Sequence, residues 1–373
     1  MRLFLCMIFS VSSIVAMGQR NYILIGTYTQ TGSKGIYVYR FDEKTGKASW
    51  VSNTDGVINP SYLAVSANGK NVYAVNETHG DVPPMVSAFS FDKNKGELKL
   101  INQQPSGGDD PCYISVTRDG KWVAAGNYSG GNLSIFKTGE AGSLLPASQV
   151  IQHIGTSLNE KRQEKAHVHS TVFTPDENYL LVADLGMDKI LSYVFNPGSE
   201  NPLQFASPAS INSEPGSGPR HLVFHPKKSI AYVMEELSGT VAVYNYNDGK
   251  LELVERVPTH AKDYQGNIGS ADIHVSPDGK FLYASNRGDQ HSISIFSINK
   301  EGKLKFVHEQ STLGKSPRNF FIHPSGKYVL AANQESDEVV IFSRNRKTGM
   351  LTDTGNRTNV PKPVCVKMIL EKN

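Results

Sequence analysis

The sequence of 373 residues predicts an all-β protein, a seven-bladed β-propeller with four-stranded antiparallel blades, and three observations support this. First, one pattern recurs: an apolar strand led by Pro, a polar turn that often reads Asp-Gly-Lys, and a second apolar strand that ends in Asn or Asp. Second, the copies repeat about every 50 residues, as between Pro60 and Pro111. Third, each copy continues into two more alternating strands, which makes four strands per unit, as in a propeller blade.

Six complete copies of this pattern follow one another along the chain. They begin at Asn59, Asp110, Ala166, Gly218, Gly269 and Ser316. Third strands such as NLSIFK from Asn132 and SISIFSI from Ser292 come next, and Gly turns lead into fourth strands such as GELKLIN. The second strands, such as KFLYASN, are nearly continuous apolar runs, which suits burial between neighbouring blades.

The seventh unit is divided between the two ends of the chain. PKPVCVKMIL from Pro361 matches the Pro-led strand, while NYILIGTY from Asn21 and GIYVYRF from Gly35 supply the next two strands. We therefore expect the N- and C-terminal strands to share one blade, which closes the ring without a free sheet edge. The longer insertions, 156–165 and 259–269, are polar loops, so residues 19–373 are predicted to form a single domain.

Residues 1–18 have the features of a secretory signal peptide. Arg2 precedes an apolar stretch from Leu3 to Met17, and the small residues Ala16 and Gly18 are spaced like a signal-peptidase site. The stretch is shorter than the about 20 apolar residues that span a bilayer. We predict cleavage after Gly18, export to the periplasm or the extracellular space, and no membrane association of the mature protein.

Composition limits the expected partners. The 38 Lys and Arg residues exceed the 35 Asp and Glu residues by only three and are scattered, which argues against nucleic-acid binding. Small-molecule ligands are favoured, bound by a monomer or a weak dimer. Cys112 and Cys365 fall in blades that are not neighbours, so we expect two buried free thiols and no disulfide.

Functional residues are expected where the repeats differ, because the shared residues build the blade. The third copy starts with His167 and His169, which point to the same side of a strand. The fourth copy carries Arg220 at its start and Glu235 and Glu236 after its second strand. In an antiparallel hairpin the start of one strand lies beside the end of the next, so these side chains are predicted to gather at one end of the channel.

The other copies add polar groups at the same end. Asn286 and Arg287 close the second strand of the fifth copy, Asp184 closes that of the third, and Arg318 follows the Pro of the sixth. Such residues can cap inner strands or contact a ligand. The candidate substrate-binding residues are His167, Asp184, Glu235, Asn286 and Arg318. No metal or cofactor is predicted, because no third ligand stands at a defined spacing from the two histidines of the third copy.

The motifs HVHSTVF, GPRHLVFHP, EELSGTV, SPDGKFLYASNRG and SPRNFFIHPSGKYVLAANQ resemble the lactonase family that includes bacterial 6-phosphogluconolactonase and fungal carboxy-cis,cis-muconate cyclase. The resemblance covers almost the whole mature chain and implies a seven-bladed propeller. The active residues that it implies are a His, an Arg, a Glu and a second Arg, which correspond to His169, Arg220, Glu236 and Arg287. The sequence departs from the family at Glu235, where Asn is frequent.

This set of side chains suits the opening of a lactone ring. A base must activate water, and cations must hold the oxyanion and any carboxylate or phosphate of the substrate. Arg220 and Arg287 suit bidentate anion binding, and either His169 or Glu236 could be the base. Three alternatives remain open: cycloisomerisation of a muconate-like acid, a non-catalytic propeller that binds sugar acids or a protein, and a structural salt bridge of the arginines with Glu236 and Asp184.

Overall fold

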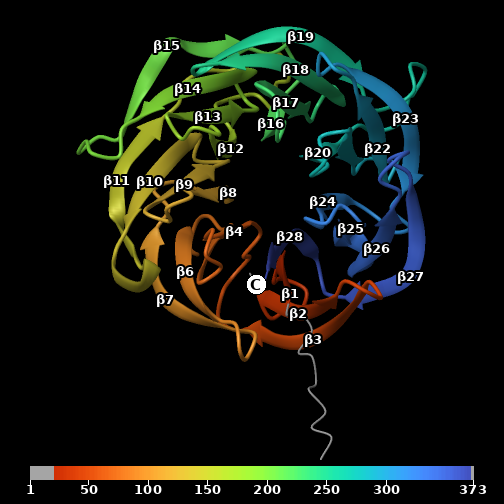
Figure 1. The fold of residues 1–373 in the computed structure, drawn as a ribbon. Helices are drawn as coiled ribbons and strands as arrows, with labels where there is room; N and C mark the ends of the chain where they lie inside the picture. Colours follow the sequence, from red (N-terminus) through yellow and green to blue (C-terminus); the bar gives the residue numbers. More distant parts are fainter. Residues whose placement is uncertain (1–20, 371–373) are drawn as a thin grey trace, which may run out of the picture.

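Residues 21–370 are described by the structure, a computed structural model, and they fold into seven four-stranded antiparallel sheets set around a common axis (Figure 1). The predicted all-β propeller with seven blades is confirmed. The predicted signal peptide, residues 1–18, lies outside the described residues. Among the described residues, no helix is long and apolar enough to cross a membrane.

The strands occupy four positions in each blade, from the axis outwards. The inner strands are β4 (Leu63–Val65), β8 (Pro111–Val116), β12 (Val168–Phe173), β16 (Pro219–Phe224), β20 (Ser270–Val275), β24 (Pro317–Ile322) and β28 (Pro363–Ile369). The second strands are β5 (Asn71–Asn76), β9 (Trp122–Asn127), β13 (Tyr179–Asp184), β17 (Ile230–Glu235), β21 (Phe281–Asn286), β25 (Tyr328–Asn333) and β1 (Asn21–Thr27).

The outer half of each blade is more polar. The third strands are β6 (Met85–Asp92), β10 (Asn132–Thr138), β14 (Lys189–Phe195), β18 (Thr240–Asn247), β22 (Ser292–Ile298), β26 (Glu338–Arg344) and β2 (Ile36–Asp42). The outermost strands are β7 (Glu97–Pro105), β11 (Leu144–Gln152), β15 (Leu203–Asn212), β19 (Lys250–Pro258), β23 (Leu304–Ser311), β27 (Leu351–Asn359) and β3 (Lys47–Thr54). Two short 3-10 turns are η1 (Glu140–Gly142) and η2 (Gln334–Ser336).

The ring closes in the blade built from both ends of the chain. Its strand order is β28-β1-β2-β3, and β1 pairs antiparallel with β28, for example Leu24 opposite Lys367. The prediction that the N- and C-terminal strands share a blade is therefore confirmed. This pairing joins residues more than 300 positions apart in sequence and leaves no unpaired edge between the first and last blades.

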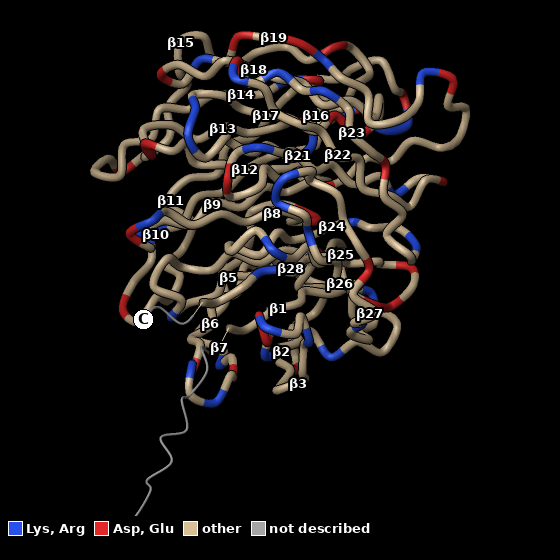
Figure 2. The backbone as a smooth tube through the Cα atoms, turned by 45° about the vertical axis from the view of Figure 1, so that its right-hand side comes forward, with Lys and Arg blue, Asp and Glu red and all other residues tan. Residues whose placement is uncertain are grey.

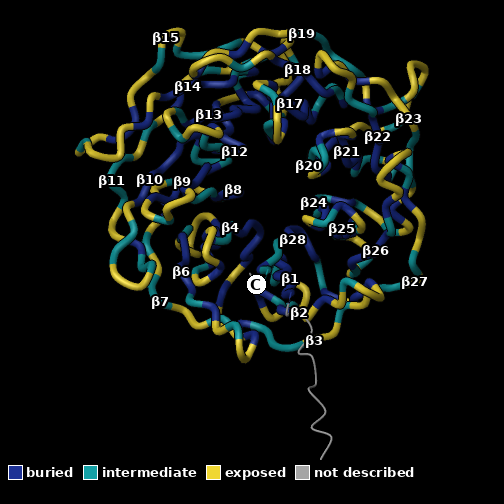
Figure 3. Tube along the Cα trace, viewed as in Figure 1, coloured by how far each residue is buried: buried dark blue, intermediate teal, exposed yellow. Residues whose placement is uncertain are grey.

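The core lies between the blades. Every residue of β9, β17 and β21 is buried, because each second strand is covered by a neighbouring blade on both faces. The outermost strands consist mostly of exposed and part-buried residues, so exposure increases from the axis to the rim (Figure 3). Lys and Arg are interspersed with Asp and Glu over the loops and outer strands (Figure 2). Cys112 and Cys365 are buried free thiols, as predicted.

Candidate active site

A β-bulge at the start of six of the seven inner strands places an extra side chain near the axis. In β16, Pro219 pairs with Glu235 and His221 with Met234, so Arg220 is the extra residue of the bulge. Equivalent register shifts occur at the starts of β8, β12, β20, β24 and β28. The extra residues of three of these bulges are Cys112 in β8, His169 in β12 and Arg318 in β24. Bulges redirect a side chain out of the alternating pattern of a strand.

The residue after each second strand contributes a second set of side chains. Its backbone N–H donates to a carbonyl oxygen in the segment that leads into the inner strand, as from Glu236 to Gly218 at 2.7 Å and from Glu77 to Asn59 at 3.0 Å. The same hydrogen bond occurs in all seven blades and fixes where this residue lies. The residues at this position are Tyr28, Glu77, Tyr128, Leu185, Glu236, Arg287 and Gln334.

The two sets of side chains enclose a cavity of about 260 Å³. Its lining residues are Tyr28, Glu77, Cys112, Tyr128, Arg162, His169, Glu236, Arg287 and Arg318. Arg220 lies directly behind this lining, with its Nε 2.8 Å from Oε2 of Glu236. The structure thus brings together His169, Arg220, Glu236 and Arg287, which the sequence had selected from four different strand ends.

Glu236 is the centre of an ionic network. Its Oε1 accepts a hydrogen bond of 2.7 Å from Arg162, and its Oε2 lies 2.8 Å from Arg220 and 3.1 Å from Arg287. Burial opposes the ionisation of this carboxyl, but the charges of Arg287 and Arg220 outweigh burial and hold the pKa of Glu236 well below its ordinary value. Glu236 is therefore a carboxylate whose two oxygens are both engaged with guanidinium groups.

His169 has ring nitrogens without strong partners. Its Nε2 lies 3.8 Å from Oε2 of Glu236, which is too long for a hydrogen bond, and its Nδ1 has only a weak 3.7 Å contact with the thiol of Cys112. Burial, followed by the charge of Arg220, holds the pKa of His169 well below its ordinary value. The imidazole is therefore neutral at neutral pH and can accept a proton from a water molecule or a substrate.

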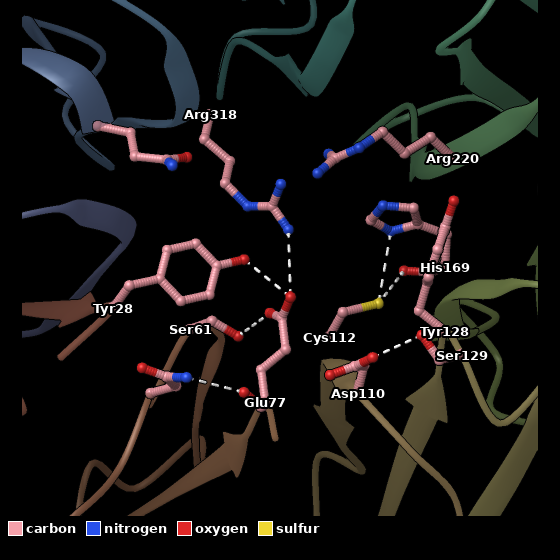
Figure 4. Close-up of polar contacts among 12 residues, drawn as sticks. Tyr28, Ser61, Glu77, Asp110, Cys112, Tyr128, Ser129, His169, Arg220 and Arg318 are labelled. Carbon is pink, nitrogen blue, oxygen red and sulfur yellow. Dashed lines mark hydrogen bonds and ion pairs between the residues drawn. The ribbon is translucent and has the colours of Figure 1, made fainter. Parts of the chain in front are cut away.

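Glu77, Tyr28 and Arg318 form the other wall of the cavity (Figure 4). Glu77 accepts hydrogen bonds from the Tyr28 hydroxyl at 2.8 Å and from the Ser61 hydroxyl. The guanidinium of Arg318 lies 3.8 Å from Glu77 and 5.6 Å from the centre of the Tyr28 ring, a cation–π arrangement. This wall therefore presents one guanidinium group that is only loosely paired with a carboxylate.

Sequence reasoning missed five residues of the cavity: Tyr28, Glu77, Tyr128, Cys112 and Arg162. The first three occupy the repeat position of Glu236 and Arg287, directly after a second strand, so a strict alignment of that position would have found them. Arg162 has no repeat equivalent, because the insertion 156–165 carries it. Its guanidinium reaches Glu236 and lies 3.2 Å from the Tyr128 hydroxyl.

Three predicted substrate-binding residues lie outside the cavity lining. Asp184, Glu235 and Asn286 are the last residues of their second strands, and the residues that follow the last two, Glu236 and Arg287, line the cavity. Successive residues of a strand point to opposite sides, so these side chains turn into the blade and pair there. Asp184 accepts from His153 at 2.7 Å, Glu235 lies 3.2 Å from Arg256, and Asn286 accepts from a serine hydroxyl at 2.7 Å. They cap strands.

The remaining predicted residues divide between the cavity and its edge. Arg318 lines the cavity. His167 does not: its ring stacks on Tyr128 with 4.3 Å between ring centres, and its Nε2 lies 3.2 Å from Glu164. Within residues 21–370, no three His, Cys, Asp or Glu side chains converge in a way that could hold a metal ion.

A wider vestibule of about 680 Å³ adjoins the cavity. The two spaces share Tyr28, Glu77 and Tyr128 in their walls. The exposed side chains Ile58 and Val82 line the vestibule but not the inner cavity. A ligand can therefore reach the guanidinium groups from this side of the ring.

Comparison with known proteins identifies the family of this chain. The family described as "Lactonase, 7-bladed beta-propeller" matches residues 22–368. A 6-phosphogluconolactonase of Formosa agariphila is 41% identical over 332 residues, 88% of this chain and 94% of the relative. The crystal structure of a candidate 6-phosphogluconolactonase from Bacteroides fragilis is 44% identical, with a TM-score of 0.90 over 95% of this chain and 99% of that one. A periplasmic gluconolactonase of Pseudomonas aeruginosa is 36% identical, with a TM-score of 0.90 over 94% and 99%. The chain therefore belongs to the lactonase family of seven-bladed β-propellers.

Proposed function

We propose that this protein is a lactonase that hydrolyses the lactone of a sugar acid. Two of its relatives are named 6-phosphogluconolactonase and gluconolactonase. The observation that carries the proposal is the charge of the inner site. Four guanidinium groups, those of Arg162, Arg220, Arg287 and Arg318, surround only two carboxylates. Three of the four guanidinium groups are largely shielded from bulk water, and this excess of positive charge favours an anionic transition state and an anionic product.

Lactone hydrolysis creates such charges at two points. Attack of water on the carbonyl carbon forms a tetrahedral oxyanion, and loss of the ring oxygen then leaves a carboxylate and a hydroxyl group. Arg287 and Arg220 lie against one wall of the cavity and Arg318 against the other, so guanidinium groups can receive the oxyanion and the product carboxylate. A phosphate on the substrate would meet the same groups.

We assign the role of general base to His169 and not to Glu236. Both groups are unprotonated at neutral pH, but the oxygens of Glu236 accept from or face three guanidinium groups. His169 has no hydrogen bond shorter than 3.7 Å on either ring nitrogen among the described residues. The imidazole takes the proton of the attacking water and returns it to the departing ring oxygen, while Glu236 holds the guanidinium groups in place.

We also propose that the protein acts outside the cytoplasm. The signal-like residues 1–18 and the likeness to a periplasmic gluconolactonase support this location. A sugar-phosphate lactone is a product of intracellular metabolism, so export favours an unphosphorylated sugar lactone as substrate. Fractionation of expressing cells and N-terminal sequencing of the mature protein test the location, with Gln19 expected as the first residue.

The proposed reaction is tested with the purified mature protein and three substrates: glucono-δ-lactone, 6-phosphogluconolactone and muconate. Acid release from the two lactones and proton uptake by muconate are followed at constant pH, and the spontaneous rates are subtracted. Turnover of either lactone supports the proposal, and the preferred lactone identifies the substrate class. Turnover of muconate alone, or of none of the three, contradicts it. Arg357→Ala is the control. It removes an ion pair with Asp353 on the outermost strand β27, so the rate should stay unchanged.

A further inference from the structure

A second polar network begins at the residue after Arg220. The imidazole of His221 is buried, and its Nε2 lies 3.2 Å from Nη1 of Arg220. Its Nδ1 lies 2.7 Å from Oδ1 of Asp272, a buried carboxylate on β20. Neither residue lines the cavity. The three groups therefore form a chain from the wall of the cavity into the inner strands of the next blade.

The contacts determine which nitrogen of His221 carries the proton. Burial opposes the ionisation of Asp272, but its neighbours His274 and His221 outweigh burial and hold the pKa of Asp272 well below its ordinary value. A carboxylate can only accept, so the proton of His221 is on Nδ1. Burial, followed by the charge of Arg220, lowers the pKa of His221 to about 3, so the ring is neutral. Its Nε2 therefore accepts a hydrogen bond from Arg220.

Asp272 is itself held by three blades. It accepts from Nε2 of His274 at 2.9 Å, from the backbone N–H of Phe320 at 3.3 Å and from the amide of Asn319. Asn319 in turn accepts from the backbone N–H of Val366 at 2.7 Å. The carboxylate is therefore fixed by the inner strands β20, β24 and β28, and it is a rigid support for the imidazole.

Arg220 depends on this support for its orientation. Only 1% of the residue is exposed, and its Nη1 donates to the carbonyl oxygen of Ala271 at 2.6 Å as well as to His221. These two acceptors fix one edge of the guanidinium plane. Its Nη2 makes no hydrogen bond within residues 21–370 and is not one of the fully buried polar atoms, so this N–H is the part of the group that is available to a substrate. A small rotation of the plane would misdirect this N–H, and misplacement by about 1 Å can cost about 100-fold in rate.

We propose that His221 and Asp272 are positioning residues, which hold the guanidinium of Arg220 in the orientation that binds the oxyanion or carboxylate of the substrate. This inference rests on the proposed lactonase function. The imidazole of His221 accepts a hydrogen bond from Arg220 and donates one to Asp272. We call this hydrogen-bonded chain of Arg220, His221 and Asp272 the relay. It holds Arg220 only while the proton of His221 is on Nδ1.

A pair of substitutions at position 221 tests the relay. The side chain of His221→Gln can accept from Arg220 and donate to Asp272, whereas His221→Leu can do neither. We expect H221L to lower kcat/KM for the lactone that the wild type hydrolyses by about 10- to 100-fold. H221Q is expected to keep a kcat/KM close to that of the wild type. If H221L does not fold, the value for H221Q alone is compared with the wild type. Equal losses in the two variants would overturn the inference.

A double-mutant cycle with Arg220→Ala separates positioning from a general structural effect. If His221 acts only through Arg220, H221L should cause no further loss in a protein that already carries R220A. Losses that add in the double mutant would overturn the proposal. The affinities of the same variants for gluconate and 6-phosphogluconate, measured by calorimetry, give a second cycle that needs no turnover.

The inference and the proposed function can fail separately. If the wild type hydrolyses no lactone, the proposed function fails, and the cycle of affinities still tests the relay. Nitrogen NMR of the histidine side chains gives a readout that needs neither substrate nor ligand. The neutral tautomer of His221 with its proton on Nδ1 is expected, and a proton on Nε2 would overturn the inference whatever the activity.

Discussion

Replacing Glu236 by Gln should destabilise the fold, because Glu236 is the one carboxylate that three guanidinium groups share. Arg162 can turn to solvent, since 43% of its side chain is exposed, but only 2% of the Arg220 side chain and 18% of the Arg287 side chain are exposed. E236Q therefore leaves two largely buried cations without their counterion. Breaking a buried ion pair from one side costs on the order of 3 to 5 kcal/mol, so we expect the free energy of unfolding to fall by about that amount.

The pH dependence of this loss follows from the lowered pKa of Glu236. A carboxyl whose pKa is lower in the folded state contributes stability above its unfolded value of about 4.3 and loses it as the pH falls toward the folded value. The difference in the free energy of unfolding between wild type and E236Q should therefore be largest at pH 7 and should become smaller below about pH 4. Urea unfolding of both proteins across this range measures it.

Glu77→Gln is the matched control for this experiment. Glu77 is also a carboxylate of the cavity wall, but its side-chain hydrogen bonds come from neutral hydroxyl groups, and the guanidinium of Arg318 is 3.8 Å away. The loss of stability in E77Q should be clearly smaller than in E236Q. A stability of E236Q equal to that of the wild type at pH 7, or equal losses in both variants, would refute the assignment of Glu236 as the counterion of the network.

Three further predictions concern the reaction and the thiol in the cavity. His169→Gln should lower kcat by about 100- to 10,000-fold with an unchanged unfolding midpoint, whereas a loss of less than tenfold would remove His169 as the base. Since burial and Arg220 keep the pKa of His169 well below its ordinary value, kcat/KM should stay level as the pH falls from about 8 to about 6; a decline with a midpoint near 6.5 would show an ordinary histidine. Burial raises the pKa of the Cys112 thiol, so Cys112 should resist iodoacetamide at pH 8 until the protein is unfolded, and rapid labelling of the native protein, read by mass spectrometry, would contradict this.

The repeat carried most of the information about the fold. Pro-led strands at a regular spacing, apolar second strands and the divided seventh unit were sufficient to predict seven blades and the pairing of β1 with β28. This succeeded because each blade repeats the same local pattern, and a sheet with two buried faces leaves a strong signal in composition. The strand boundaries mattered little for this conclusion.

The site was predicted less completely, and most of the errors concern the ends of the second strands. The sequence pointed to the ends of the second strands but did not distinguish the last residue of a strand from the next one. Asp184, Glu235 and Asn286 were therefore chosen beside Glu236 and Arg287, although the side chains alternate between the blade and the cavity. Glu77, at the same repeat position as Glu236, was overlooked because that position was not compared across all the blades.

The order of residues along the chain was enough to establish the propeller, the closure of its ring and the presence of His169, Arg220, Glu236 and Arg287 near one end of it. Only the folded ring determined their environment. The bulges that direct Arg220 and His169 toward the axis, the reach of Arg162 from its insertion and the contact of His221 with Asp272 all depend on chain segments from different blades. Burial and the charges of these distant neighbours set the protonation states, and those are properties of the assembled cavity that a repeat of about 50 residues does not carry.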